Sequence, residues 1–416
     1  MSGAQLAEQA WEPARPGAGP LRVAVVGLGW AGRSIWIPRL DEHPRFTVAA
    51  AVDPDAGARA SVAAARSTGG GRDDPSGPRL LADPGLLTAR DVDLAVVAVP
   101  NHLHSRVAAR LLTAGVPVFL EKPVCLNAVE ADELAQAERA GGAVLLAGSA
   151  ARCRADVRAL YDLARACGTI RHVDLSWVRA RGVPDAGGWF TDSRRAGGGA
   201  LLDLGWHLLD TAAPLLGTAS FDEVVGTVSA DFVRAGTGAA TWRRAGDLDP
   251  DPGPHPDPDP HPDTDSGADL ASAVRRVDVE DTARGFLITQ NGVSVSLRAS
   301  WASHEAWDST VIRVEGSAGT ATLACTFGFS PNRRGGPVLT YTRDGDTVRV
   351  PVPPEAVGTE YRRQLDEIPG LLADPDSPGR AVAEARRAVD AVERFYGSAH
   401  SRTALPAGPG PRSRRT

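Results

Sequence analysis

A short apolar strand runs directly into a glycine-rich turn near the start of this 416-residue chain. Leu21–Val26 reads LRVAVV, and β-branched apolar runs of this kind are typical of strands buried in a parallel sheet. The next six residues have the spacing G-x-G-x-x-G, whose glycines permit a tight turn, close approach of backbone to a pyrophosphate, and close packing of the following helix. The residues of this predicted dinucleotide-binding turn are Gly27, Leu28, Gly29, Trp30, Ala31 and Gly32.

An acidic residue follows the second predicted strand, 47–52. Asp53 is placed to accept hydrogen bonds from both ribose hydroxyls of a dinucleotide and to repel a 2′-phosphate. We therefore expect NAD as the cofactor. NADP stays an alternative, because Arg59 or Arg66 could reach a phosphate.

Two further strand ends carry polar residues. The predicted strand 93–99 runs into Pro100, Asn101 and His104, and the strand 116–120 delivers Glu121 and Lys122. In open α/β sheets, ligands bind beyond the carboxyl ends of the strands. We therefore predict that these residues converge with the glycine turn on one cofactor site, in a doubly wound parallel sheet that spans residues 21–148.

Lys122 is the only lysine of the chain, so the 45 Lys and Arg residues include 44 arginines. A GC-rich gene replaces Lys by Arg wherever a fixed positive charge is enough. A lysine that survives this drift indicates a need for a compact ammonium that can shift its pKa and pass a proton. Lys122 is accordingly our first catalytic candidate.

A second polar group lies on the predicted helix 200–216. Asp203 and His207 are four residues apart and therefore share a helix face, and Asp210 follows one turn later. A histidine beside a carboxylate is a candidate acid or base with a fixed tautomer. The surrounding residues are mostly leucine, so the helix is expected to be buried, and buried polar groups need partners.

The second domain, residues 149–396, is expected to be an α+β unit with a largely antiparallel open sheet. Period-two alternation predicts its strands at 172–179, 223–233, 281–289, 293–301, 311–323 and 339–350, and helices close it at 360–372 and 380–396. Three segments are expected to be disordered: the tails 1–20 and 397–416, and an insert of Asp-Pro repeats at 246–265. Weak metal binding by His255 and His261 of that insert is a minor alternative to our expectation of no metal site.

Composition excludes several classes of protein. A formal net charge of -6 gives no reason to expect a nucleic-acid or anionic membrane partner. No apolar stretch approaches the ~20 residues that span a bilayer, and the first residues lack the pattern of a signal peptide. The four cysteines have no Cys-x-x-Cys spacing and are expected to be reduced thiols of a cytoplasmic protein.

Three motifs together make the chain resemble the Gfo/Idh/MocA family of nicotinamide-dependent oxidoreductases. They are the glycine turn with Asp53, the run from Pro100-Asn101 to Glu121-Lys122-Pro123, and Gly198-Gly199-x-x-x-Asp203-x-x-x-His207-x-x-Asp210. The resemblance covers roughly residues 22–396. It implies that Lys122 contacts the reacting hydroxyl, that Asp203 and His207 complete the polar site, and that the open sheet mediates a homodimer or homotetramer.

The chain departs from this family in two places. Cys153 follows Arg152 where an aromatic residue is more usual, which puts substrate detail in doubt, and the Asp-Pro insert is not a family feature. Arg152 and Trp189 are our further candidates for substrate contacts. The run GLGWAGRSIWIPRL also resembles oxidoreductases that accompany aminosugar and aminohydroxybenzoate biosynthesis in antibiotic-producing bacteria.

The predicted reaction is reversible hydride transfer between NAD(P) and a secondary alcohol of a sugar, a sugar nucleotide such as UDP-glucose, or a cyclitol. His207 is our choice of base, oriented by Asp203, while Lys122 donates to the substrate oxygen; Lys122 itself is the alternative base. Two other functions stay open: a non-catalytic NAD or sugar sensor that regulates a partner, and reduction of an imine or an unsaturated ring.

Overall fold

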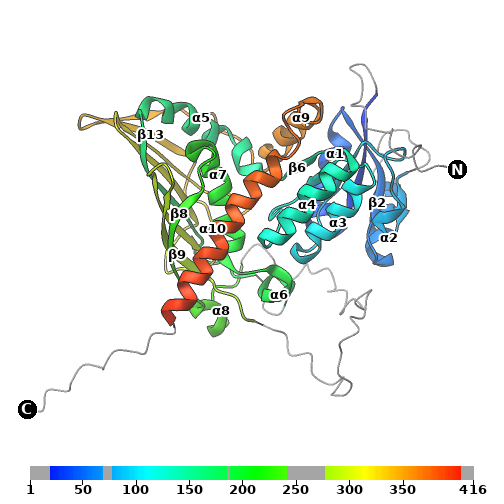
Figure 1. Ribbon diagram of the computed structural model, residues 1–416, viewed down its shortest axis with the longest axis horizontal. Helices are drawn as coiled ribbons and strands as arrows, with labels where there is room; N and C mark the ends of the chain where they lie inside the picture. The colour runs from blue at the N-terminus through cyan, green and yellow to red at the C-terminus, as the bar shows by residue number, and fades with distance from the viewer. Residues whose placement is uncertain (1–18, 69–76, 185–187, 241–276, 404–416) are drawn as a thin grey trace, which may run out of the picture.

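The computed structural model describes residues 19–68, 77–184, 188–240 and 277–403. The Asp-Pro insert, residues 1–18 of the predicted N-terminal tail and residues 404–416 of the predicted C-terminal tail lie outside the described residues. In Figure 1 the N-terminal sheet and a larger second sheet lie on opposite sides of the molecule, with helix α10 running along the second sheet.

The first sheet contains six parallel strands in the order β3-β2-β1-β4-β5-β6. These strands are β1 (Leu21–Val26), β2 (Phe46–Val52), β3 (Arg79–Leu81), β4 (Leu94–Val97), β5 (Val118–Leu120) and β6 (Leu145–Ala147). Its helices are α1 (Ile37–Glu42), α2 (Ala56–Thr68), α3 (His104–Thr113) and α4 (Ala128–Gly141). The strand order reverses between β1 and β4, and in such sheets the crevice at this switch point is where a dinucleotide binds.

The second sheet has eight strands in the order β14-β13-β12-β11-β7-β10-β9-β8, all antiparallel to their neighbours except the parallel pair β7 and β10. These strands are β7 (Ile170–Val178), β8 (Phe221–Ser229), β9 (Thr282–Thr289), β10 (Ser294–Ser300), β11 (Ser309–Gly316), β12 (Thr320–Cys325), β13 (Val338–Arg343) and β14 (Asp346–Val350). The predicted fold class, a Rossmann sheet followed by an α+β domain, is confirmed.

Helices cover one face of the second sheet: α10 packs on β8, α7 on β7 and α5 on β12. The helices of this part of the chain are α5 (Ala155–Ala164), α6 (Ser193–Ala196), α7 (Trp206–Leu216), α8 (Asp231–Ala235), α9 (Thr359–Ala373) and α10 (Arg380–Thr403). The other face carries partly exposed side chains, among them Val225 and Phe286, which are paired across β8 and β9.

Two predicted strands turn out to be hairpins. The run 311–323 is divided by the turn after Gly316 into β11 and β12, and the run 339–350 is divided by Asp344 and Gly345 into β13 and β14. Both turn residues of the second hairpin have positive φ, 51° and 89°. Tight two-residue hairpin turns require positive φ at both positions, and Asp-Gly pairs adopt it readily. The alternation of apolar and polar residues continues through each turn, so it gave no sign that each run forms two strands.

Two other predicted ends were also wrong. The run 223–233 leaves the sheet at Ser229, because the buried carboxylate of Asp281 accepts hydrogen bonds from the backbone N–H groups of Phe232 and Val233 (2.7 and 2.9 Å) and holds them in α8. Helix α10 continues to Thr403, so residues 397–403 are helical and not part of a disordered tail.

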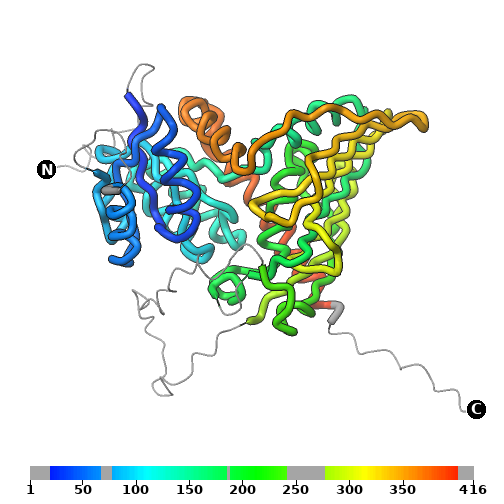
Figure 2. Tube along the Cα trace, turned by 180° about the vertical axis from the view of Figure 1, so that it is seen from behind, coloured from blue at the N-terminus to red at the C-terminus, as the bar shows by residue number. Residues whose placement is uncertain are grey.

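Helix α9 packs with the first domain although its sequence position lies in the second. Leu365, Ile368 and Leu372 belong to the same buried cluster as Val23 and Phe119 of the parallel sheet. Figure 2 shows α9, in orange, beside the blue N-terminal strands. The first domain is therefore built from residues 21–148 together with α9. In the described part of the chain, no helix combines the length and the apolarity that a membrane crossing requires.

Candidate active site

The glycine turn has the geometry of a dinucleotide-binding turn. Gly27 has φ 92°, and a Cβ there would lie 2.6 Å from the carbonyl oxygen of Ala98. A Cβ on Gly32 would lie 2.0 Å from the carbonyl oxygen of Gly27. A Cβ on Gly29 would have no atom within 4 Å, so open space adjoins the turn where a pyrophosphate must approach. A π-helical turn, η1 (Ala31–Trp36), leads into α1 and directs its first N–H groups toward this space.

Asp53 lies beside the turn, as predicted. Its carboxylate accepts hydrogen bonds from the backbone N–H groups of Leu28 (2.8 Å) and Asp55 (2.9 Å), one on each oxygen. Each carboxylate oxygen can accept a second hydrogen bond, so both ribose hydroxyls can still be bound. Arg59 donates to the backbone carbonyls of Asp53 and Pro54, and Arg66 forms an ion pair with Asp41. The residues therefore fit NAD, and both candidate partners of a 2′-phosphate are engaged elsewhere.

The turn after β4 is joined to its surroundings by two buried side chains. Asn101 donates to the carbonyl oxygen of Ala196 (2.9 Å), in α6 of the second domain. The ring nitrogens of His104 lie 2.6 Å and 2.8 Å from the carbonyl oxygens of Pro123 and Val99. Burial, opposed by these two carbonyl contacts, lowers the pKa of His104 to about 4. These contacts fix the turns around the site, and a direct cofactor contact from Asn101 or His104 stays a prediction.

Lys122 and Asp203 meet across the two domains. Lys122 Nζ lies 2.6 Å from Asp203 Oδ1, and the indole N–H of Trp301 donates to Asp203 Oδ2 at 3.0 Å. Burial alone would raise the pKa of Asp203, but the charges of Lys122 and Arg179 outweigh it and hold that pKa well below its usual range. Asp203 is thus an anion that holds the ammonium group of Lys122 in place.

Glu121 supports the same turn from the first domain. Its carboxylate accepts from the indole N–H of Trp36 (2.8 Å) and from the backbone N–H of Lys122 (3.2 Å). Burial raises its pKa, although Lys122 opposes the change. Glu121 therefore orients the lysine through the backbone, and cofactor binding by Glu121 stays a prediction.

His207 lies near this pair, but Asp203 does not orient it as we expected. Both carboxylate oxygens of Asp203 are taken by Lys122 and Trp301, and Asp203 lies in a π-helical turn, η7 (Leu201–Gly205), that precedes α7. The His207 ring lies 5.5 Å from that of Trp177, and among the described residues no hydrogen bond is made to its ring nitrogens. Burial and the charge of Lys122 lower its pKa to about 3, so the ring is neutral at pH 7.

Arg152 lies in a different group from Lys122, at the other end of α7. Its guanidinium pairs with Asp210 Oδ1 (2.7 Å) and Glu384 Oε2 (2.6 Å), and Ser149 also donates to Asp210 (3.1 Å). This group lines a small cavity of about 40 Å³ between α7 and α10. Because its charge is used by two carboxylates, Arg152 is a structural clamp here. Trp189 packs on Phe190 with ring centroids 4.0 Å apart, and its substrate contact stays a prediction.

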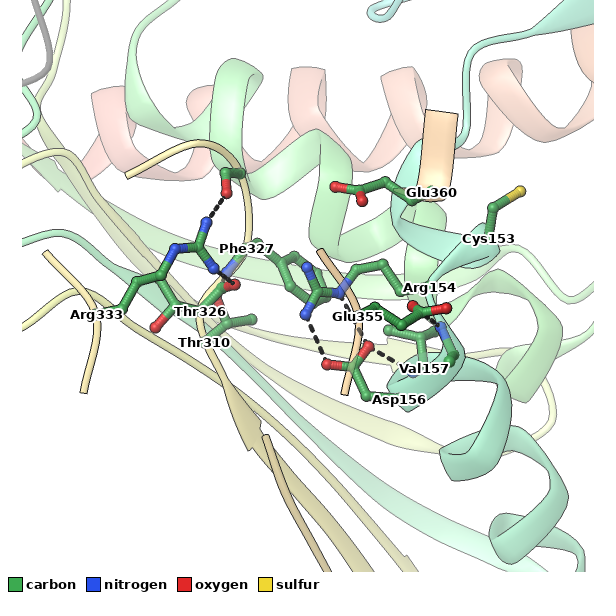
Figure 3. A network of polar contacts seen from close by, with 12 residues as sticks. Cys153, Arg154, Asp156, Val157, Thr310, Thr326, Phe327, Arg333, Glu355 and Glu360 are labelled. Atoms are coloured by element: carbon green, nitrogen blue, oxygen red, sulfur yellow. Dashed lines mark hydrogen bonds and ion pairs between the residues drawn. The ribbon is translucent and has the colours of Figure 1, made fainter. Parts of the chain in front are cut away.

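The loop between β12 and β13 carries Phe327 and Arg333, which Figure 3 shows with Arg154 and Asp156. Phe327 packs edge-on against Trp177 (5.4 Å), and Arg154 lies over its other side, 4.8 Å from the ring centroid, while pairing with Asp156. Arg333 donates to the loop carbonyls of Thr326, Gly328 and Ser330. Arg333 thus ties three carbonyls of the loop together, and the ring centroid of its next aromatic residue, Phe329, lies 5.7 Å from that of Trp30 in the glycine turn.

Sequence reasoning missed three residues of this site: Trp177, Arg179 and Trp301. Each lies at or just after the end of a strand, and Trp301 was predicted only as the last apolar residue of a strand. The available signal was the position of a large or charged side chain at a strand end. Among the described residues no group of three or more His, Cys, Asp or Glu side chains could hold a metal ion.

This fold and site define a nicotinamide-dependent oxidoreductase. The family description "oxidoreductase family, NAD-binding Rossmann fold" matches residues 21–149, and the Gfo/Idh/MocA C-terminal domain matches residues 156–322. The chain therefore belongs to the Gfo/Idh/MocA family, and it is an NAD(P)-dependent oxidoreductase.

Three relatives illustrate the range of similarity. A protein of Amycolatopsis mediterranei (strain S699), named as the oxidoreductase subunit of a UDP-kanosamine synthase, is 57% identical over 93% of this chain and 99% of its own. The D-glucoside 3-dehydrogenase of Escherichia coli (strain K12) is 28% identical over 52% of this chain and 59% of its own. The solved structure of GenD2 from gentamicin A biosynthesis, in complex with NAD, has a TM-score of 0.65 at 23% identity and covers 92% of this chain and 95% of its own, which shows the fold.

Proposed function

We propose that the protein oxidises the C3 hydroxyl of UDP-glucose with NAD, giving a 3-keto sugar nucleotide that a second enzyme aminates. The observation that carries the proposal is the contact of Lys122 with Asp203, 2.6 Å, at the carboxyl ends of the parallel strands and beside a glycine turn that fits NAD. A cation held by a buried anion is suited to bind the oxygen of a reacting alcohol.

The identity of the substrate is supported by the relatives. Kanosamine is 3-amino-3-deoxyglucose, so a UDP-kanosamine synthase must introduce a ketone at C3 before nitrogen enters there. The relative bearing that name is 57% identical to this chain over nearly its full length. The D-glucoside 3-dehydrogenase is named for the same carbon.

The protein must manage one proton while the hydride leaves C3. Bound NAD supplies the hydride acceptor. Lys122 donates a hydrogen bond to the substrate oxygen and stabilises the developing alkoxide, and Asp203 fixes the position of that ammonium. His207 is neutral, and its ring nitrogens make no hydrogen bond to described residues, so one of them can accept the hydroxyl proton. Lys122 is the alternative acceptor.

The preference for NAD over NADP follows from the Asp53 region. The carboxylate repels a 2′-phosphate, and the guanidinium groups of Arg59 and Arg66 are engaged with backbone carbonyls and with Asp41. We expect kcat/KM to be higher with NAD than with NADP.

Assembly is a second part of the proposal. The paired residues Val225 and Phe286, 38% and 44% exposed, place apolar surface on the uncovered face of the second sheet, which supports a homodimer or homotetramer. The word "subunit" in the name of the Amycolatopsis relative supports a second, aminating chain as partner. Light scattering of the purified protein, with and without a Phe286→Glu change, tests the self-association.

The activity itself is tested by the absorbance of reduced nicotinamide. Purified protein with NAD is offered UDP-glucose, dTDP-glucose, free hexoses and inositols, and the Lys122→Ala variant is measured alongside. We expect the absorbance to rise with UDP-glucose for the wild-type protein and not for the variant. NMR of the product should place its ketone at C3. Turnover of free sugars or inositols alone contradicts the proposed substrate.

The sensor alternative makes a different prediction in the same experiment. A regulatory protein would bind NAD tightly and turn over none of these compounds in either direction. The intact pair of Lys122 and Asp203 favours an enzyme, because a sensor has no need of a positioned ammonium beside the nicotinamide site.

A further inference from the structure

Strands β7 and β10 end, and the antiparallel strand β11 begins, at the same level of the second sheet. The residues that flank these three strand ends lie next to one another. Val178 at the end of β7 is paired with Ser300 of β10 on one side and with Ser309 of β11 on the other. The residues just beyond these positions are Arg179, Trp301 and Asp308. Trp301 already belongs to the site, since it donates to Asp203. The register therefore places Arg179 and Asp308 at the same sheet edge as the catalytic group.

Arg179 is held in a defined position at this edge. Its guanidinium carbon lies 5.2 Å from the ring centroid of Trp177, which also contacts His207. A Cβ on Gly182 would lie 2.4 Å from Arg179 Cδ, so the glycine leaves the room that this side chain occupies. Burial lowers the pKa of Arg179, and the charges of Asp203 and Asp308 oppose this change.

Two buried polar atoms beside Arg179 lack a hydrogen-bond partner. Trp177 is 3% exposed and its indole N–H has no acceptor, and Asp308 is 2% exposed and its Oδ2 has no donor. The other oxygen of Asp308 accepts from the backbone N–H of Ala180 (2.8 Å) and from Asn332 (3.2 Å). Unpaired buried polar atoms are rare and costly, so a donor and an acceptor left unpaired on two neighbours of Arg179 point to a ligand group that can both give and accept a hydrogen bond.

We propose that Trp177, Arg179 and Asp308 form a substrate subsite that binds a sugar hydroxyl next to the reacting carbon. A hydroxyl is the simplest group that accepts from an indole or guanidinium and donates to a carboxylate. This subsite selects a vicinal diol, because a substrate without the second hydroxyl leaves the indole N–H of Trp177 and Oδ2 of Asp308 unpaired.

The proposal rests on the proposed function for the identity of the reacting carbon. If C3 of UDP-glucose reacts, the bound hydroxyl is the one at C2 or at C4. The subsite itself needs only a substrate with neighbouring hydroxyls, so free sugars or cyclitols would use it in the same way.

The test combines protein variants with deoxy substrates. The variants are Arg179→Met, Arg179→Lys and Asp308→Asn, which keeps the acceptor for Ala180. Arg171→Met is the matched control, because it removes the same charge from an exposed position at the opposite end of β7. The substrates are UDP-glucose and its 2-deoxy and 4-deoxy derivatives. The affinity for NAD, measured by fluorescence, shows that each variant is folded.

The expected result is a loss that depends on one hydroxyl. Arg179→Met and Asp308→Asn should lower kcat/KM for UDP-glucose roughly ten- to a hundredfold, the effect of a hydrogen bond to a charged group, and Arg171→Met should change it less than about twofold. With one of the two deoxy substrates, wild-type and Arg179→Met should be equal within about twofold.

A different pattern overturns the subsite. If Arg179→Met and Arg179→Lys lower kcat/KM by the same factor for all three substrates while NAD binding is intact, Arg179 acts only on the structure. If wild-type binds NAD and oxidises none of the sugars, the proposed function fails by itself. The subsite is then judged by calorimetric Kd for UDP-glucose, which Arg179→Met must raise and Arg171→Met must not.

Discussion

The two ends of helix α7 and its preceding turn carry similar charged groups that do different work. At one end Asp203 holds Lys122, and at the other Asp210 holds Arg152. In the Asp210 group the cation has a second carboxylate, Glu384, and Ser149 donates to Asp210, although Arg152 Nη2 makes an ion pair with Asp210 without a hydrogen bond. The Asp203 group is incomplete, because it adjoins a histidine whose ring makes no hydrogen bond to described residues and two buried polar atoms without partners.

This difference separates a catalytic ion pair from a structural one. Both carboxylates lie on the same helical segment and are seven residues apart, and both bind a cation from a distant part of the chain. The two ion pairs differ in the groups that surround them. A cation shared by two carboxylates stabilises the packing of α7 against α10, whereas an ion pair beside an unpaired indole N–H and an unpaired carboxylate oxygen is suited to contact a ligand.

The largest expected effect is that of Lys122→Arg. Arginine keeps the charge but cannot give up a proton and does not fit the compact contact with Asp203. We expect kcat to fall at least about a hundredfold, the usual effect of losing a positioned acid or base, while Kd for NAD changes little. Steady-state kinetics and fluorescence titration measure the two values. Turnover near that of wild-type would remove Lys122 from the mechanism.

The second effect compares the two carboxylates directly. Asp203→Asn removes the anion that positions Lys122, and we expect kcat to fall roughly ten- to a hundredfold with little loss of NAD affinity. Asp210→Asn should leave kcat within about twofold and lower Tm. Equal losses of kcat in both variants would mean that the two ends do not differ in the way that the structure indicates.

The third effect concerns stability. Arg152→Met leaves Asp210 and Glu384 as neighbouring anions in a mostly buried place, which should cost roughly 2 to 4 kcal/mol of the free energy of unfolding. Urea unfolding measures this change. The substrate KM, measured in the cold where the variant stays folded, should be unchanged, and an increase larger than about tenfold would restore Arg152 to the substrate site.

The smallest expected effect concerns the titration of His207, which should not be seen near neutral pH. Because burial and the charge of Lys122 lower the pKa of His207 to about 3, its ring should stay neutral from pH 8 down to about pH 5. NMR of the ring protons, assigned with a His207→Gln variant, should show no titration in this range. Lys122→Met should raise the pKa of His207 because it removes a nearby cation. A midpoint near 6.5 in wild-type would mean that His207 is solvated.

The depressed pKa also sets the pH dependence of folding. In the unfolded chain His207 binds a proton near pH 6.5, and in the folded chain only near pH 3, so the unfolded state binds more protons in between. His104 behaves in the same way, with a folded pKa of about 4. The stability that the neutral rings retain above pH 6.5 is therefore lost progressively as the pH falls below it.

The central strands of the first domain could be predicted from the sequence, whereas β3 and the contribution of α9 could not. Strand β1 has the predicted bounds, and α4 begins at a local signal, the N-cap Asn127, which accepts from the backbone N–H of Glu130 at 2.9 Å. These elements are signalled by neighbouring residues, through apolar runs, glycine spacing and caps. The hairpin turns of the second sheet were missed because the alternation of β11 continues into β12 across its turn.

The candidate site was predicted only in part, for a related reason. Lys122, Asp203 and His207 have local signals, namely a rare residue type and helical spacing. Arg179 and Asp308 become neighbours only through the pairing of β7 with β11, and Trp301 through that of β7 with β10. The register between strands that are distant in sequence depends on the whole sheet, so no local sequence pattern predicts that these residues are neighbours. The ion pair of Arg152 with Glu384 could not be predicted, because the two residues are far apart in sequence, and a substrate contact of Arg152 stays a prediction.

The packing of α9 has a consequence for how the protein is made. Leu365, Ile368 and Leu372 contribute to the core of the nucleotide-binding half, whose other elements lie much earlier in the chain. The apolar face that α9 covers therefore stays exposed until the ribosome has synthesised the chain to residue 373. Domains at the N-terminus usually fold first during translation. Here the core of the nucleotide-binding domain can be completed only after the strands of the second sheet have been synthesised.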